Sequence, residues 1–472
     1  MGTHRPRVLV LADVGSPSYH VGDEAVGQAA AARLAERGLT PVVVSNGRHL
    51  AADYEGLEVV TGPPLPLDRV ELVGAHRALA ADPAAAERGR HGPALEAIAR
   101  NVGAVDAVLV AGGGNLASAF DWLLYQRIAH LLLAQRRGLP TAVSGQTLGP
   151  VLVDADIAEL APVMGAARTI GLRERRSSEL GRRIQPRDVT ADCLDDAQFF
   201  GPFGADEPGA GVLAAGGAPR TVVATVAPPG PHVHPGEQAE RFARDLVALH
   251  ERTGCRILLV PHKGRIPGAG GEDEAVAEDI QRRARCPMIS VEPVTSARRA
   301  AEAVGEADLV ITNRYHPVVF ALARGVPVLP LVEDDYADAR IDGVLDRWGL
   351  AGRGVPVRTL DEGEITAAAL AVWEERGAYV AHIRAAAPDL RAFHEQWWDA
   401  LAARLAADAA LAVPLPWLCR PRPLPVPQLL AGLRRRGLPA LRVTGELAQL
   451  RAELLEERAE NRLARHNDPN LT

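Results

Sequence analysis

The chain has 472 residues, of which 47% are hydrophobic and 24% charged, and its formal net charge is -7 at pH 7. This length predicts two to three domains of about 150 residues each, and the composition excludes a chain that is disordered throughout. The negative charge argues against a general nucleic-acid-binding protein. No apolar run approaches the ~18–20 residues of a membrane span, and no signal-peptide pattern is seen. The sequence predicts a soluble cytoplasmic protein, with peripheral membrane association left open.

Strands and helices alternate through the first half of the chain. Short apolar runs predict strands at residues 7–14, 41–45, 107–111, 141–144, 169–172 and 189–190. Helical spacing of apolar residues lies between them, at 22–37, 122–137, 156–166 and 177–183. Alternation at this spacing is typical of right-handed βαβ units that build a parallel sheet. We therefore predict an N-terminal Rossmann-like domain over residues 1–200.

A second alternation follows a segment rich in Gly, Ala and Pro. That segment, residues 201–219, is predicted to be an interdomain linker. Strands are then expected at 221–226, 257–260, 289–291, 309–311 and 326–332. The prediction is an α/β fold in which two Rossmann-like parallel-sheet domains face a cleft, the second over residues 220–360.

The C-terminal part of the chain is predicted to be a helical extension. Residues 361–412 are expected to form closing helices, with one apolar face made by Leu390, Phe393, Trp397 and Leu401. The tail, residues 413–472, begins as a Pro/Arg-rich segment. Spacing of Leu447, Leu450 and Leu454 predicts a short amphipathic helix in it, too brief for a coiled coil.

The most informative stretch of the sequence is residues 308–336. An apolar strand ends in Asn313-Arg314-Tyr315-His316, and a short helical pattern and a second apolar strand follow. Residues at the carboxyl end of the first strand of a β-α-β unit lie in the ligand crevice. A guanidinium and an imidazole at a helix N-terminus favour an anionic ligand. The alternative is a structural Arg314 that is paired with a neighbouring carboxylate.

Other predicted strand ends also release glycine or polar residues. Gly112-Gly113-Gly114-Asn115 predicts a tight turn whose exposed amides could hold an anion. Further candidates are Asp23 and Glu24 in a first helical turn, Gln146 and Arg173 after strands, and Lys263, the single lysine of the chain. Each alone is as compatible with a structural role, but carboxyl-end loops of one sheet share one edge. We therefore predict a single site at this edge.

In their order and spacing, these motifs resemble the polysaccharide pyruvyl transferase family over roughly residues 7–350. The resemblance rests on seven short motifs: Gly22-Asp23-Glu24, Gly112-Gly113-Gly114, residues 146–150, Leu172-Arg173-Glu174, Asp192, Pro261-His262 and Arg314-Tyr315-His316. It implies a two-domain fold of the GT-B type and transfer of a pyruvyl group from phosphoenolpyruvate onto two sugar hydroxyls, which forms a ketal. Two departures are Pro317, where the family usually has Ser, and Arg340, where Lys is more usual.

The resemblance assigns donor contacts to Arg314, His316 and Arg173. The chemistry adds Lys263 and the amides of Gly113 and Gly114, because phosphoenolpyruvate carries a carboxylate and a phosphate. We expect His316 to be the general acid and Asp23 the base. Residues expected on the acceptor side are Glu24, Asn115 and Gln146. Phosphoenolpyruvate is then a co-substrate, and no metal or further cofactor is expected.

Two other functions remain open from the sequence. A GT-B glycosyltransferase with a nucleotide-sugar donor would usually carry a Glu pair eight residues apart, but Glu333 has Ile341 at that offset. A binding protein that kept the fold and lost catalysis would use its tail to dock a partner. The sequence does not identify the acceptor glycan or the oligomeric state.

Overall fold

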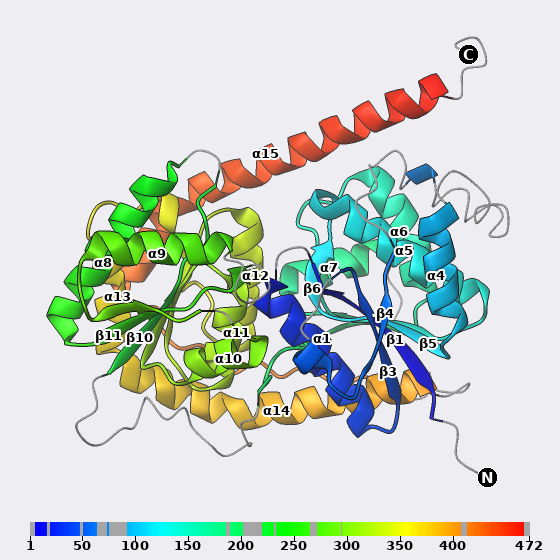
Figure 1. The fold of residues 1–472 in the computed structure, drawn as a ribbon, viewed down its shortest axis with the longest axis horizontal. Coiled ribbons are helices and arrows are strands. Elements are labelled where there is room, and N and C mark those ends of the chain that lie inside the picture. Colours follow the sequence, from blue (N-terminus) through cyan, green and yellow to red (C-terminus); the bar gives the residue numbers. More distant parts are fainter. Residues whose placement is uncertain are drawn as a thin grey trace.

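The computed structural model places most of the chain in two α/β lobes that lie side by side (Figure 1). It describes residues 5–16, 19–47, 51–63, 73–74, 92–185, 189–201, 220–230, 233–264, 271–293, 295–406 and 413–466. All of the predicted linker except its first residue lies outside these ranges. Among the described residues, no helix is both long and apolar enough to cross a membrane.

The N-terminal lobe is built on a parallel sheet with the strand order β4-β3-β1-β5-β7-β8-β9. Its strands are β1 (Arg7–Val14), β3 (Thr40–Ser45), β4 (Glu58–Thr61), β5 (Ala107–Val110), β7 (Thr141–Leu148), β8 (Thr169–Leu172) and β9 (Thr190–Asp192), and β6 (Gly113–Leu116) pairs with β7. The helices are α1 (Val21–Glu36), α4 (Gly92–Gly103), α5 (Asp121–Arg136), α6 (Asp154–Ala166) and α7 (Arg175–Ile184). The apolar runs that predict strands become fully buried, as in Val8–Val10 and Ala107–Val110.

The C-terminal lobe repeats this architecture with the order β13-β11-β10-β14-β15-β16. These strands are β10 (Thr221–Thr225), β11 (Arg256–Leu259), β13 (Ile289–Val291), β14 (Leu309–Thr312), β15 (Val328–Val332) and β16 (Val355–Pro356). Its helices are α8 (Pro235–Thr253), α9 (Glu272–Ala284), α10 (Ala297–Gly305), α11 (Tyr315–Ala323) and α12 (Asp335–Arg347). Numbered within the lobe, the order is 3-2-1-4-5-6, the doubly wound Rossmann arrangement. The predicted fold class is confirmed.

A small antiparallel ladder joins the two lobes. β2 (Tyr19–His20) follows β1, and β12 (Lys263–Gly264) follows β11. Lys263 is paired with His20, and the Val21 amide donates to the His262 carbonyl at 3.0 Å. The segments that follow β1 of one sheet and β11 of the other therefore meet between the lobes, where a doubly wound fold places its ligands.

Helices α13 (Glu364–Glu374) and α14 (Arg376–Ala406) follow the second sheet. α14 runs along both lobes (Figure 1) and packs on β5, β7 and α1 of the N-terminal lobe. The predicted apolar face is buried, with Trp397 fully inside and its indole N–H donating to Ser144 Oγ at 2.9 Å. The closing helix thus ties the second lobe back to the first.

The helix of the tail is much longer than predicted. α15 spans Gln428–His466 and includes Pro439. Local composition argued against helix before residue 440, but tertiary contacts decide the conformation here. Leu430, Leu433 and Leu441 are buried on the C-terminal lobe, and Arg434 forms an ion pair with Asp338 at 2.7 Å. α15 then continues along the side of the molecule opposite α14 (Figure 1).

Candidate active site

The N-terminus of α11 brings the Arg314/His316 pair to the face between the lobes. Arg314 is the N-cap residue, in extended conformation, and its amide donates to Thr312 Oγ1 at 2.9 Å. His316 lies in the first helical turn, against the first turn of α1 across the interface. The approach is so close that a Cβ on Gly22 would lie 1.7 Å from His316 Nδ1, so this position requires glycine.

The imidazole of His316 is buried, with 6% of the residue exposed. Its Nε2 lies 4.0 Å from Asp195 Oδ2 of the N-terminal lobe and has no hydrogen-bond partner among the described residues. Burial, together with the positive charges of Arg173 and Arg340, lowers the pKa of His316 well below its usual value. The ring is therefore neutral near pH 7 in this state.

Arg314 takes the alternative that the sequence left open, pairing with a carboxylate. Its Nε and NH2 donate to the two oxygens of Asp273 at 3.1 and 2.5 Å, a bidentate pair. Asp273 is fully buried in the first turn of α9 and also accepts the amides of His262 and Lys263. A donor anion would have to compete with this carboxylate for the guanidinium.

Asp23 lies in the cleft at the start of α1. Its Oδ2 is 3.2 Å from His20 Nδ1. Burial raises the pKa of Asp23 to about 6, although the guanidinium groups of Arg127, Arg173 and Arg340 act in the opposite direction. Burial also lowers the pKa of His20 to about 4. The cleft thus holds a carboxyl group that titrates near neutral pH, as a base must.

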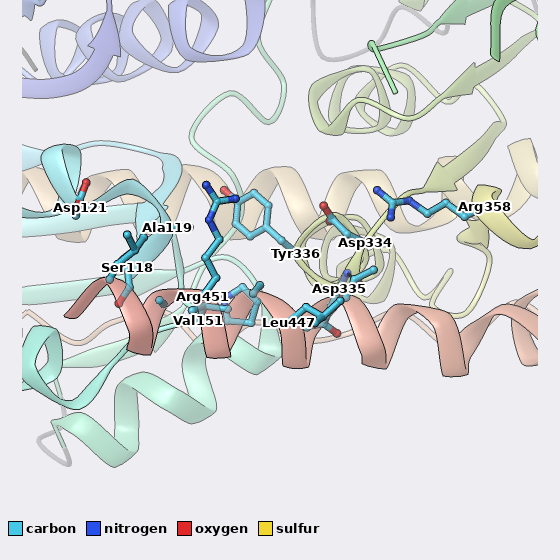
Figure 2. Close-up of a pocket in the computed structure, with 16 residues that line it drawn as sticks. Ser118, Ala119, Asp121, Val151, Asp334, Asp335, Tyr336, Arg358, Leu447 and Arg451 are labelled. Atoms are coloured by element: carbon cyan, nitrogen blue, oxygen red, sulfur yellow. Dashed lines mark hydrogen bonds between the residues drawn. The ribbon is translucent and has the colours of Figure 1, made fainter. Parts of the chain in front are cut away.

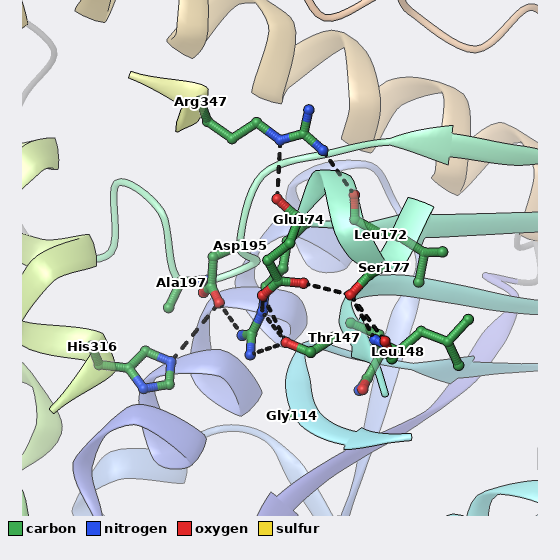
Figure 3. A network of polar contacts seen from close by, with 12 residues as sticks. Gly114, Thr147, Leu148, Leu172, Glu174, Ser177, Asp195, Ala197, His316 and Arg347 are labelled. Carbon is green, nitrogen blue, oxygen red and sulfur yellow. Dashed lines mark hydrogen bonds and ion pairs between the residues drawn. The ribbon is translucent and has the colours of Figure 1, made fainter. Parts of the chain in front are cut away.

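Figure 3 shows a buried polar network that includes Thr147, Glu174 and Asp195, and Arg173 donates to all three. Only 2% of Arg173 is exposed. Its guanidinium also lies 4.4 Å from the centre of the Tyr315 ring. Asp195 lies between Arg173 and His316 and contacts both. The guanidinium of Arg173 is therefore near His316, but its N–H groups already donate to protein side chains.

The glycine motif forms a strand rather than the predicted tight turn with free amides. Gly113 begins β6, and the Gly112 amide donates to Asp196 Oδ2 at 2.7 Å in a buried setting. The turn prediction was wrong because β6 pairs with the extended end of β7. Gly114 instead allows close approach of the other lobe, since its carbonyl accepts the Tyr336 hydroxyl at 2.5 Å.

Asn115 and Gln146 lie beside this motif and are both buried. Gln146 Nε2 donates to the Ala111 carbonyl at 2.5 Å. Gln146 Oε1 and Asn115 Oδ1 have no hydrogen-bond partner in the described part of the chain. Buried acceptors of this kind are costly unless a ligand or water satisfies them. Both residues are therefore available for a ligand.

Two predicted site residues, Glu24 and Lys263, have their charged groups engaged in contacts away from His316. Glu24 is 1% exposed, and its carboxylate accepts the Gly15 amide at 3.0 Å and the Tyr54 hydroxyl at 2.7 Å. Burial raises the pKa of Glu24 to about 7. Lys263 is part of the interlobe ladder, and its Nζ pairs with Glu272 at 2.9 Å. Both positions support the structural interpretation.

Sequence analysis missed three residues of the site, which are Arg127 on α5, Asp195 after β9 and Tyr336 on α12. It noted Arg340, also on α12, as a departure from the family but did not assign it to the site. Arg127 is 1% exposed, and its Nε and NH2 lack partners among the described residues, as does Arg340 Nε. The signal for Arg127 was weak: an arginine in the otherwise apolar stretch of a helix that becomes buried.

A pocket of about 560 Å³ opens beside Tyr336, between the lobes and under α15 (Figure 2). Its walls combine apolar side chains, among them Val151 and Leu447, with polar and charged ones. The charged side chains are those of Asp121, Asp334, Asp335, Arg358 and Arg451. Such mixed walls suit a sugar, which has apolar faces and many hydroxyls.

The two Rossmann-like lobes and the crossing C-terminal helix define a protein of the GT-B fold. Solved structures of similar fold include a putative UDP-N-acetylglucosamine 2-epimerase from Listeria monocytogenes, with a TM-score of 0.52, 13% identity and coverage of 90% of this chain and 100% of that one. Another is MnaA of S. aureus in a co-structure with UDP, with a TM-score of 0.51, 10% identity and coverage of 89% of this chain and 100% of that one. At such identities the likeness concerns the fold alone.

The family is given by the sequence. A family model described as polysaccharide pyruvyl transferase matches residues 20–335, well over half of the chain, and the chain belongs to this family. It is thus a transferase that acts on polysaccharide. A search of curated proteins finds no significant match.

Proposed function

We propose that this protein transfers the pyruvyl group of phosphoenolpyruvate onto two hydroxyls of a sugar in a glycan and so forms a pyruvate ketal. The observation that carries the proposal is the meeting of His316 with the α1 N-terminus and the Asp195–Arg173 pair between the lobes. Family membership supports it. This setting combines a titratable imidazole, a titratable carboxyl and several guanidinium groups, as an enol phosphate donor requires.

The reaction balances with these groups. A proton is added to C3 of the enol, a first sugar hydroxyl attacks C2, the bond from C2 to the phosphate oxygen breaks, and a second hydroxyl closes the ketal. Of the two hydroxyl protons, one replaces the proton delivered to C3 and the other leaves with inorganic phosphate. We assign proton delivery to His316 and acceptance of a hydroxyl proton to Asp23.

The protonation state of His316 implies that the donor binds before proton transfer. The imidazole is neutral in this structure, because burial lowers its pKa. A bound dianion favours the imidazolium and raises that pKa. Donor binding therefore comes first and loads His316 with the proton it delivers.

We place the acceptor in the pocket under α15. The pocket adjoins Tyr336, whose hydroxyl reaches Gly114. Its carboxylates can accept hydrogen bonds from sugar hydroxyls, and Pro150 and Val151 can cover an apolar sugar face.

Thermal-shift measurements with phosphoenolpyruvate, with UDP-sugars and without ligand test the donor, because a ligand of the native state raises the melting temperature. We expect a shift with phosphoenolpyruvate. A shift with UDP-sugars alone would indicate a glycosyltransferase, and no shift with either would indicate an inactive binding protein. Incubation with candidate oligosaccharides, followed by mass spectrometry for a pyruvyl increment, then tests the transfer.

A further inference from the structure

The outer face of α15 carries an apolar row that the described part of the chain does not cover. Val443, Leu447, Leu450 and Leu454 are 52%, 58%, 60% and 47% exposed. Their spacing of four, three and four residues is that of the a and d positions of a heptad repeat. We call these four side chains the α15 seam.

The seam lies on a helix that is fixed in place by its other contacts. The first half of α15 is buried on the C-terminal lobe through Leu430, Leu433 and Leu441. Farther along, Ala452 packs against Val151 and Val153 of the N-terminal lobe. Leu447 also borders the pocket under α15, whereas Val443, Leu450 and Leu454 do not. The exposed side chains of the seam are therefore open to a partner while other side chains of the same helix hold the two lobes.

The charges that flank the seam identify the partner and its direction. With Leu447 and Leu454 at position a, the g positions hold Glu446 and Glu453, and the e positions hold Arg451 and Arg458. In a parallel pair each g residue faces the e residue five positions on in the other helix, so both contacts join Glu to Arg. In an antiparallel pair g faces g and e faces e, which would join like charges.

We propose that α15 pairs with α15 of a second copy of this chain as a parallel two-stranded coiled coil through the seam. The two-fold axis then runs along the helices, and the pockets under α15 of the two copies lie on either side of the pair. Glu457 occupies the next d position, so the apolar seam spans two heptads. An interface of two heptads is short, so dimer formation depends on protein concentration, and a concentration series is required to observe it.

A lipid surface fits the seam less well. Residues 443–459 contain four glutamates and two arginines, a net charge of -2. An amphipathic helix on an anionic membrane is typically rich in Lys and Arg on its polar face. The charges of α15 complement a second α15 better than they complement anionic lipid.

Sedimentation velocity of the full chain over a concentration series tests the proposal. We expect a dimer for the natural sequence and at least about tenfold weaker association for Leu450→Glu/Leu454→Glu, which removes two apolar contacts per helix. The matched control is Leu429→Glu, an exposed leucine (41%) on the half of α15 that is docked on the C-terminal lobe. Circular dichroism and melting temperature verify that each variant is folded.

A charge exchange tests the direction of the pair. Glu446→Arg/Glu453→Arg places Arg opposite Arg in the parallel pair and should weaken the dimer, and adding Arg451→Glu/Arg458→Glu should restore it. A chain that is monomeric at every concentration would overturn the proposal, as would a dimer unaffected by the seam variant. Binding of the natural chain to vesicles of anionic lipid, lost in the seam variant and without dimers in solution, would assign the seam to membranes instead.

Discussion

His316 combines a position between two lobes with an environment that removes its charge. Gly22 lies against one side of the ring, and Nε2 points to Asp195 at 4.0 Å without a hydrogen bond. A neutral imidazole of this kind is poised to gain a proton when a negative ligand arrives. The residue is well suited to couple donor binding to proton transfer.

Replacement of His316 tests this role directly. His316→Ala and His316→Gln should each lower kcat for phosphate release by about 100-fold or more, because positioned acid–base groups contribute roughly that much. His382 serves as control, since it lies on the crossing helix α14 and its Nε2 contacts the Trp348 carbonyl at 2.7 Å. His382→Gln should keep wild-type activity. Near wild-type turnover in both His316 variants would remove the residue from the mechanism.

Asp23 should set the acid limb of the pH profile. Its pKa is about 6, and the proposed base is the ionised form, so kcat/KM should fall as pH drops through about 6. Asp23→Asn should lower activity strongly and abolish this limb. A profile that keeps its limb near pH 6 in the variant would assign that titration to another group.

The same shift carries a stability cost that Asp23→Asn should relieve. The carboxyl holds its proton more tightly in the folded chain than in the unfolded one, so stability declines as pH rises between about 4 and about 6. At pH 7 the variant should be more stable by on the order of 2 kcal/mol. Urea unfolding of both proteins at pH 7 measures this difference, and an unchanged or lower stability would contradict the buried setting of Asp23.

Asp273 and the proposed donor compete for the guanidinium of Arg314. The bidentate pair occupies the guanidinium that the family resemblance assigns to the donor. Asp273→Asn should therefore tighten phosphoenolpyruvate binding, and Arg314→Ala should weaken it. Isothermal titration calorimetry measures both affinities. If neither changes, Arg314 serves only to neutralise Asp273.

At the scale of elements, the two lobes are joined both by buried hydrogen bonds of Arg347 and by an exposed ion pair of Arg176. Arg347 on α12, labelled in Figure 3, is 1% exposed. It donates to the Arg173 carbonyl at 3.0 Å and to Asp192 Oδ1 at 2.8 Å in the other lobe. Burial alone would raise the pKa of Asp192, but Arg347 and Ser178 hold it below its usual value. Arg176 also reaches across to Asp335, from an exposed position.

These two arginines form a matched pair of tests for lobe closure. Arg347→Ala should lower stability by about 3 kcal/mol, because it leaves buried acceptors unpaired. Arg176→Ala should cost less than about 1 kcal/mol, since exposed ion pairs contribute little. Small-angle scattering should show a more open molecule only for Arg347→Ala. Equal effects of the two variants would mean that closure does not depend on the buried contact.

Local sequence pattern was sufficient for the parts of the fold that are buried on both sides. β1, β8 and β14 are continuous apolar runs, and the segments that follow β1 and β14 bring the start of α1 and His316 into contact. Local sequence pattern did not predict contacts or secondary structure that depend on a segment distant in the chain. Asp273, the partner of Arg314, is 41 residues away on another helix. In the same way, β6 exists because β7 pairs with it, and the first half of α15 because a lobe buries it.

For the molecule as a whole, α14 links the two lobes into one cooperative unit. Trp397 is fully buried in the N-terminal lobe, where its indole donates to Ser144, while the same helix begins on the C-terminal lobe. The natural chain should therefore unfold in a single calorimetric transition. Trp397→Ala removes one of the two fully buried tryptophans of α14 and should cost about 3–5 kcal/mol.

Because this loss falls on the contact between α14 and one lobe, we expect the transition of Trp397→Ala to split, with the N-terminal lobe melting first. Trp417 is the control, since it is 88% exposed on the segment between α14 and α15. Trp417→Ala should leave the calorimetric trace unchanged. A single transition that merely shifts to lower temperature in Trp397→Ala would show that the site between the lobes, rather than α14, supplies most of the coupling between them.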